Sequence, residues 1–213
     1  MDMMNLTVRN RIIGSFLLII AILALLAGAS YLRLAQIEKG TQSMLDDSVP
    51  GAYYINKTQN EWARHMLETR RTLVDLVTRS NSTVMTAHQE EFARIESSLV
   101  ELLKQYQQTV HMASDRALIE RFEQQAQQYL RQHVQLREML QQATPQEASQ
   151  FSIQNVFPAW DQAQQVLDEL VENNRVQSDH AARSIRDEVL GLKIDLLLAV
   201  LLAIIASAVC GWL

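Results

Sequence analysis

Two long apolar runs stand near the ends of the chain, and a polar stretch with helical periodicity separates them. The first apolar run covers residues 12–32, and the second covers residues 196–213. At a rise of about 1.5 Å per residue, each run crosses or nearly crosses a hydrocarbon core about 30 Å thick. The pattern therefore predicts two transmembrane helices that enclose an extramembrane domain over residues 33–195.

Within that domain, apolar side chains recur at intervals of three and four residues, which is the period of a helix with one buried face. Polar or proline-containing breaks divide the stretch into four helical segments. The side chains expected on the inner faces are Trp62, Met66, Leu73 and Val77; Phe92, Ile95, Leu99, Leu102, Leu103 and Tyr106; Leu118, Phe122, Tyr129, Leu136 and Leu140; and Val166, Leu167, Leu170, Val171 and Ile185.

The breaks carry residue types that are typical of helix ends. Residues 144–147 read Thr-Pro-Gln-Glu, the spacing of a capping box with proline at the first helical position. Residues 113–115 offer cap residues for the third segment, and the polar cluster at 80–83 ends the first. The Pro-Gly pair at 50–51 is expected to kink or interrupt its helix, and residues 157–158 to disturb the fourth.

Helices of about 30 residues joined by short turns pack antiparallel. An up-down-up-down order returns the chain to the end of the bundle where it began, as two membrane spans require. The sequence thus predicts an all-α fold, an antiparallel up-down-up-down four-helix bundle over residues 33–195. Residues 1–11 form a short N-terminus, 12–32 the first span and 196–213 the second.

The charges beside the first run indicate its orientation. Arg9 and Arg11 precede it and favour a cytoplasmic N-terminus, whereas Arg33 and Lys39 on the other flank oppose that orientation. Residues 27–29, Ala-Gly-Ala, resemble a signal-peptidase site, so a cleaved signal peptide is the alternative. The run is longer than the usual apolar core of a signal peptide, which favours an uncleaved anchor. With a cytoplasmic N-terminus, the domain would lie on the opposite side of the membrane.

Composition argues against enzymes and nucleic-acid partners. The net charge is −5, no block of basic residues occurs, and the single cysteine, Cys210, lies in the second apolar run. No phosphate-binding loop or nucleophile motif is present. We therefore expect no enzyme activity, no cofactor and no metal. The five histidines lie more than twenty residues apart and are expected to face solvent: His65, His88, His111, His133 and His180.

Arginines on the first segment are the candidate binding residues. Arg70 and Arg79 are nine residues apart, which places them about 180° apart around one helix. One helix cannot aim both at a small anion, but two copies related by a two-fold axis can offer one arginine each. Arg71, Asp75 and Arg79 also form a ladder in which Asp75 can pair with either arginine. The alternative is that all of these are solvated surface charges.

This segment also carries a family resemblance. Trp62, then Met-Leu-Glu-Thr-Arg at 66–70, then Asp75 and Arg79, resembles the first periplasmic helix of the bacterial chemoreceptors for aspartate and serine. Their motif is a tryptophan, Met-Leu-Gln-Thr-Arg, and arginines five and nine positions further on. The order of span, bundle and span agrees along the whole chain. The resemblance implies the sensor of a methyl-accepting chemotaxis receptor, which is a homodimer in the bacterial inner membrane.

The resemblance also implies a ligand site at the dimer interface. Arg70 and Arg79 of opposite subunits would bind the carboxylate of a small organic acid or amino acid. The start of the fourth helix would form the wall of the site. Asp75 replaces an arginine and Val156 stands near a threonine position, so an organic acid, or an aromatic acid held by Trp160 and Tyr53, fits equally well. The implied ligand-binding residues are Arg70, Val74, Asp75, Arg79, Gln154, Val156 and Phe157.

Signal relay would follow from continuity, because no flexible linker separates the fourth helix from the second span. By resemblance, a small piston-like slide would reach a HAMP domain and a kinase-control region with its kinase and adaptor. The sequence stops within the second apolar run, so we expect it to be a fragment cut before that region. The alternatives are the input domain of a histidine kinase or nucleotide cyclase, sensing through a periplasmic binding protein, and a ligand-free helical scaffold.

Overall fold

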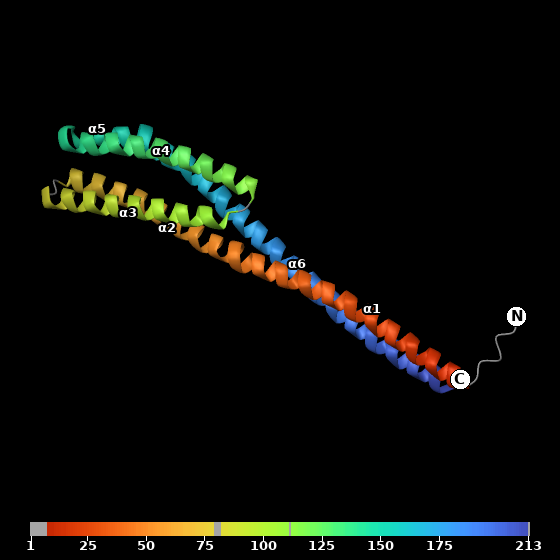
Figure 1. Ribbon diagram of the computed structural model, residues 1–213. Helices are drawn as coiled ribbons and strands as arrows, with labels where there is room; N and C mark the ends of the chain where they lie inside the picture. Colours follow the sequence, from red (N-terminus) through yellow and green to blue (C-terminus); the bar gives the residue numbers. More distant parts are fainter. Residues whose placement is uncertain (1–7, 79–81, 111, 213) are drawn as a thin grey trace. The chain divides into compact units, whose positions relative to one another are not determined.

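The computed structural model describes residues 8–78, 82–110 and 112–212, and these ranges contain helices and no strand (Figure 1). The predicted all-α class is confirmed. The elements, in chain order, are α1 (Val8–Ser43), the π-helical segment η1 (Met44–Ser48), α2 (Val49–Val77), α3 (Ser82–Thr109), α4 (Ala113–Gln142), α5 (Pro145–Phe151), the π-helical segment η2 (Ser152–Val156) and α6 (Phe157–Trp212).

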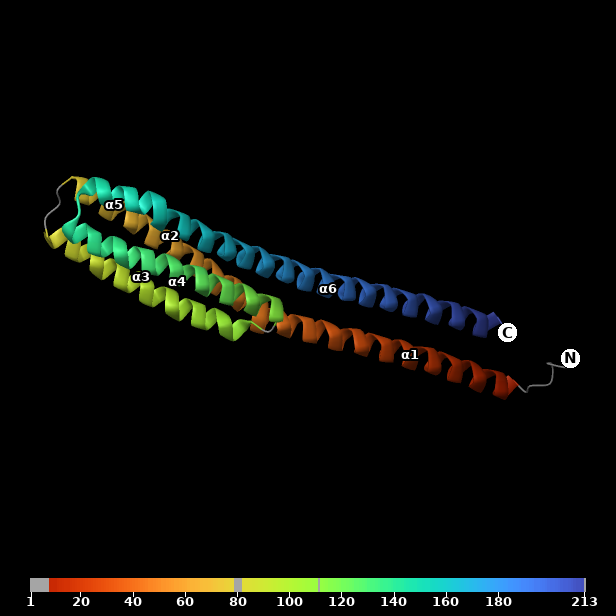
Figure 2. The same cartoon turned by 90° about the horizontal axis from the view of Figure 1, so that it is seen from above.

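One compact unit covers Leu45–Ser178. Within it, α2, α3, α4 and the run from α5 into α6 lie side by side and alternate in direction (Figures 1 and 2). This is the predicted antiparallel four-helix bundle. The turns between its helices are short, since α3 begins five residues after α2 ends and α5 begins three residues after α4 ends.

The second compact unit contains α1 up to Met44 and the part of α6 from Asp179 onward. Arg33 joins these two helices, because its guanidinium donates hydrogen bonds to Glu188 at 3.2 Å and to Asp195 at 2.6 Å. Gly191 leaves room for this arrangement, since a Cβ there would collide with the arginine head group. The ion pairs hold α1 and α6 together just outside the predicted spans.

Two helical stretches are long and apolar enough to cross a membrane. They are Ile19–Val77 and Pro145–Ala206, whose most apolar windows have mean hydropathies of 1.7 and 2.6. Neither window is buried within the protein. By length and composition these stretches match the two predicted spans.

Both prolines near predicted irregularities follow a π-helical segment. Pro50 lies in the first turn of α2, directly after η1. The chain stays helical through η1, so the Pro-Gly pair does not break the helix, but the π-helical segment is a local irregularity of the predicted kind. Pro158 follows η2 in the same way, which confirms the predicted disturbance of the fourth helix.

The capping box at the start of α5 is confirmed. The Thr144 hydroxyl accepts a hydrogen bond from the Glu147 backbone N–H at 3.3 Å, and the Glu147 carboxylate accepts one from the Thr144 backbone N–H at 2.8 Å. Two backbone donors that a helix terminus leaves unpaired are thereby satisfied.

We expect Thr144→Ala to lower the free energy of unfolding by about 1 kcal/mol, because the side-chain acceptor of the cap is lost. Chemical denaturation of the full chain in detergent measures the change. Thr144→Ser keeps the hydroxyl and serves as the control. Equal losses in the two variants would show that the cap bond does not stabilise α5.

The expected cap at residues 113–115 is wrong. The residue that precedes α4 is Met112, which has an extended backbone and no side-chain cap bond. Asp115 is buried instead and accepts hydrogen bonds from Asn173 and Gln177 of α6. The fold places its carboxylate between helices, where α6 supplies two amide donors. Residues 80 and 81 of the other expected turn lie outside the described residues.

Trp62 lies at the centre of the bundle core. It is 1% exposed, contacts Phe122 and Tyr129 edge to face, and stacks on Trp160 with ring planes 6° apart. The predicted inner faces are largely confirmed, but Val77 is 61% exposed. Val77 is the last residue of α2, beyond the part of the helix that the core covers. The buried apolar residues are Ile55, Trp62, Met66, Phe92, Ile95, Leu99, Tyr106, Val110, Ile119, Phe122, Ala126, Tyr129, Leu136, Ala148, Val156, Ala159, Ala163, Val166, Leu167 and Leu170.

The expectation that the histidines face solvent is wrong for three of the five. His65, His88 and His133 are at most 9% exposed, whereas His180 is exposed and His111 lies outside the described residues. The three buried rings occupy inner-face positions of α2, α3 and α4. Polar neighbours from other helices make this burial tolerable for His65 and His88.

Candidate functional site

Arg70 is an exposed arginine of α2 whose guanidinium forms no ion pair or hydrogen bond with the described residues. Arg70 contacts Phe157, the first residue of α6. The centre of the Phe157 ring lies 5.6 Å from Cζ of Arg70. An arginine over an aromatic face gains a modest cation–π attraction. All five guanidinium N–H donors therefore stay available for an anion.

The surface around Arg70 includes other predicted binding residues. Val74 lies one turn further along α2 and is 60% exposed, so it shares the face of Arg70. Gln154 is exposed on η2, three residues before Phe157. It also lines a hollow of about 540 Å³ between Val77 and α5. We call Arg70, Val74, Gln154 and Phe157 the Arg70 surface.

Two of the predicted site residues lie elsewhere. Asp75 pairs with α3, and Val156 is completely buried in the bundle core, where its methyl groups cannot line a surface site. Arg79 lies outside the described residues. Trp160 stacks on Trp62, and Tyr53 contacts Tyr54 and Lys57. These contacts do not place either aromatic ring against Arg70.

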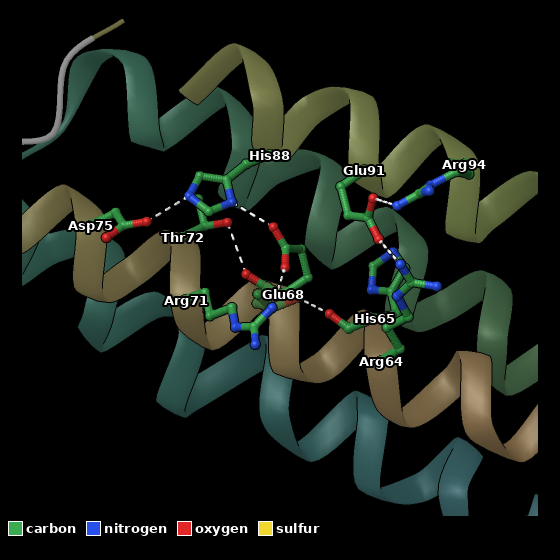
Figure 3. A network of polar contacts seen from close by, with 10 residues as sticks. Arg64, His65, Glu68, Arg71, Thr72, Asp75, His88, Glu91 and Arg94 are labelled. Carbon is green, nitrogen blue, oxygen red and sulfur yellow. Dashed lines mark hydrogen bonds and ion pairs between the residues drawn. The ribbon is translucent and has the colours of Figure 1, made fainter. Parts of the chain in front are cut away.

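Asp75 belongs to a polar network between α2 and α3, shown in Figure 3. His88 of α3 lies between two carboxylates, with Nδ1 2.5 Å from Glu68 and Nε2 2.8 Å from Asp75. Arg71 approaches the Glu68 carboxylate at 3.5 Å. The expected pairing of Asp75 with a neighbouring arginine of its own helix is therefore wrong for Arg71, because the histidine of α3 takes its place.

This network keeps His88 protonated to a higher pH than usual. Burial alone would lower the pKa of His88, but the hydrogen bonds to Glu68 and Asp75 outweigh burial, and the pKa lies above its ordinary value. Both ring nitrogens can donate only in the imidazolium form. The charged ring thus satisfies two carboxylates, one of which, Glu68, is itself buried.

We expect His88→Gln to lower the free energy of unfolding by about 1–3 kcal/mol in mildly acidic solution, since hydrogen bonds between charged groups are lost. Because the pKa of His88 is higher in the folded state, protonation of His88 stabilises the fold fully at pH values below the unfolded-state pKa of about 6.5. This stabilisation is lost as the pH rises through the folded-state pKa. The difference between the two proteins should therefore shrink with rising pH. Urea titrations at several pH values measure it.

The same titrations in the background Glu68→Gln/Asp75→Asn provide the control. Without the two carboxylates, little should hold the histidine charged, and the pH trend of His88→Gln should flatten. A stability difference that is constant with pH in the original background would contradict the charged pairing.

Sequence reasoning did not identify the role of Glu68 and His88. They are 20 residues apart in the chain and belong to different helices, so no motif joins them. The one available signal was the position of His88 in line with Phe92 and Ile95 on the inner face of α3, whereas Glu68 lies among other buried polar residues of α2 and no pattern marks it.

The chain matches the family described as a four helix bundle sensory module for signal transduction over residues 5–189. The match includes α1, the whole bundle and the first half of α6. No curated protein matches the chain.

Proposed function

This chain belongs to the family of four-helix-bundle sensory modules for signal transduction, and we propose that it binds a small organic anion at the Arg70 surface. The ligand would be an organic acid or an amino acid. The domain would face the periplasm of a bacterial cell, with both spans in the inner membrane. Binding would be relayed along α6 into the second span, toward a chemotaxis kinase and its adaptor.

The observation that carries this proposal is the Arg70 guanidinium, which lies beside the Phe157 ring and has no ion-pair partner among the described residues. Other arginines of the bundle form ion pairs with carboxylates. Arg64 pairs with Glu91, and Arg121 pairs with Glu169. Arg70 instead lies beside the Phe157 ring. The planar fork of an arginine matches the two oxygens of a carboxylate, and an adjacent aromatic ring restricts its orientation.

A second copy of the chain would complete the site. Arg79 lies outside the described residues, and by the sequence prediction it would serve the partner subunit. A homodimer with a two-fold axis would then place one arginine of each kind at each of two equivalent sites. Asp75 does not oppose an anion directly in this arrangement, because His88 holds its carboxylate against α3.

The relay would depend on α6. This helix extends from Phe157, which contacts Arg70, to Trp212 without a break. An anion that draws the guanidinium away from the ring changes a contact at the first residue of that helix. A signal requires that α6 can take two positions, and that the ligand binds the protein more tightly when α6 is in one of them.

The test is a thermal-shift screen of the purified full chain in detergent micelles. The probes are dicarboxylic, hydroxy, aromatic and amino acids, each tested against the original chain, Arg70→Ala and Arg70→Lys. A ligand present at 100 times its dissociation constant stabilises the folded state by about 2.7 kcal/mol, which is a readable shift. Arg131→Ala is the matched control, because Arg131 is an exposed arginine of α4 with no recorded partner.

We expect at least one acid to raise the melting temperature of the original chain and of Arg131→Ala, but not that of Arg70→Ala. Arg70→Lys should bind more weakly, since a lysine cannot form the paired hydrogen bonds. A hit that survives in Arg70→Ala would move the site elsewhere. The absence of any hit would favour sensing through a binding protein or a ligand-free scaffold.

A further inference from the structure

Three side chains from three different helices converge inside the bundle. They are His65 of α2, Glu96 of α3 and His133 of α4, and one nitrogen or oxygen atom of each lies within 4.8 Å of the other two. Both histidines are almost completely buried, and the glutamate is partly exposed. No spacing motif predicts this group, because its members are 31 and 37 residues apart along the chain.

The hydrogen bonds around His65 are compatible with a proton on either ring nitrogen. The Thr69 hydroxyl donates to the His65 carbonyl oxygen at 2.9 Å, and the Tyr129 hydroxyl lies 3.3 Å from Thr69 and 2.7 Å from His65 Nδ1. One arrangement of protons satisfies these three contacts and leaves Nε2 free to bind a cation. In it, Nδ1–H donates to Tyr129, which donates to Thr69, and Nε2 of the neutral ring is left with a lone pair.

That lone pair faces a carboxylate. Nε2 of His65 lies 3.4 Å from Oε1 of Glu96. A lone pair and an anion at this distance repel each other unless a positive species lies between them. The position therefore suits a proton or a metal cation.

His133 favours the metal over the proton. Its ring centre lies 4.6 Å from that of His65, and its Nδ1 is buried without a hydrogen-bond partner among the described residues. A proton held between His65 and Glu96 would leave this buried nitrogen without a partner, whereas a metal ion could use it to complete a coordination shell.

The spacing of His65 and Glu96 suits a small divalent ion. Zinc binds histidine nitrogen and carboxylate oxygen at about 2.0–2.2 Å, so two ligand atoms of a tetrahedral site lie about 3.3–3.6 Å apart. The 3.4 Å between His65 Nε2 and Glu96 Oε1 falls in that range, and a His133 nitrogen lies within 4.8 Å of a ligand atom of each residue. The Tyr129 hydroxyl orients the ring of His65 from the other side, as outer hydrogen bonds do in metal sites.

We propose that His65, Glu96 and His133 bind a divalent transition-metal ion of the zinc class, which ties α2, α3 and α4 together. Of the three residues, Glu96 alone also lines a hollow of about 690 Å³ between α3 and α4, so the group borders open space on the glutamate's side. This site is separate from the Arg70 surface and does not depend on it.

Arg137 is the competing cation. Its guanidinium lies 3.6 Å from the same Glu96 oxygen that would bind the metal. It must give way when the ion enters, and its partial exposure lets it turn toward solvent. Removal of this charge should therefore strengthen metal binding, whereas removal of any ligand should weaken it.

The experiment is a Zn²⁺ titration of the full chain in detergent micelles, stripped of metal with a chelator and followed by calorimetry. Co²⁺ serves as a second probe, because its visible absorption reports tetrahedral nitrogen and oxygen ligands. The variants are Glu96→Gln, His133→Asn and Arg137→Gln, and the control is His180→Asn, an exposed histidine of α6. Circular dichroism of each variant reports its helix content.

We expect one ion per chain, a higher melting temperature with Zn²⁺, and a tetrahedral Co²⁺ spectrum. Affinity should fall at least about 10-fold in Glu96→Gln and His133→Asn, stay unchanged in His180→Asn and rise in Arg137→Gln. The proposal is overturned if no ion binds, if affinity survives in the ligand variants, or if it is lost in His180→Asn. If Glu96→Gln or His133→Asn loses its helix content, the proposal is judged on the two remaining results. It stands only if Arg137→Gln binds Zn²⁺ more tightly and the Co²⁺ spectrum is tetrahedral.

Discussion

Trp62→Ala is expected to lower the free energy of unfolding by about 3–5 kcal/mol, because a large buried aromatic side chain is deleted from the core. The Trp62 ring contacts Phe122 of α4 and Tyr129 of α4, and it stacks on Trp160 of α6. One substitution on α2 therefore removes contacts with two other helices. Urea denaturation of the full chain, followed by circular dichroism, measures the loss.

Two controls isolate the cause. Trp62→Phe keeps an aromatic ring and should cost much less, since the indole N–H of Trp62 has no hydrogen-bond partner to lose. Trp160→Ala should also cost less, because Trp160 is only partly buried. A loss in Trp62→Ala no larger than that in Trp160→Ala would show that Trp62 is not the centre of the core.

Val156→Asp is expected to be similarly damaging, with a loss of about 3–5 kcal/mol, because an unpaired charge would enter the core. Val156 is completely buried, whereas Ile153 in the same π-helical segment is 61% exposed. Both are branched aliphatic residues, so hydrophobicity alone does not say which one faces inward. The packing of η2 against the bundle determines that Val156 is buried and Ile153 is exposed.

Ile153→Asp is the matched control and should change the free energy of unfolding by no more than about 0.5 kcal/mol. Denaturation curves of both variants test the orientation of η2. Comparable losses at the two positions would mean that the segment is rotated from its position in the structure. The result also bears on binding, because a buried Val156 cannot line an anion site at the surface.

The Arg70 surface consists of four of the seven residues that the family resemblance implied, and its role in binding stays a prediction. Arg70 and Phe157 are 87 residues apart, yet both were identified as site residues through the family resemblance, and the structure brings them together. Asp75 and Val156 were assigned to the same site and lie elsewhere. The resemblance aligns positions along a chain, but it does not say which way a side chain points when a residue such as Asp75 replaces the arginine of the family motif.

The histidines show a different limit. Their wide separation argued against a metal site, since metal ligands on one helix recur at three- or four-residue spacing. His65, Glu96 and His133 lie close together because α2, α3 and α4 place them at the same level along the bundle axis. Such a convergence requires the register of each helix against its neighbours, which single-helix periodicity does not contain.

The sequence by itself determined the elements of this protein: two apolar spans, four amphipathic segments, the capping box at Thr144 and most of the inner-face residues. These features follow from local propensity and periodicity, which act within a few residues along the chain. The tertiary structure alone decided that Asp75 pairs with His88, that Val156 is buried, and that two histidines and a glutamate share one site. These outcomes depend on helix register and rotation, which are set by the packing of side chains from distant parts of the chain.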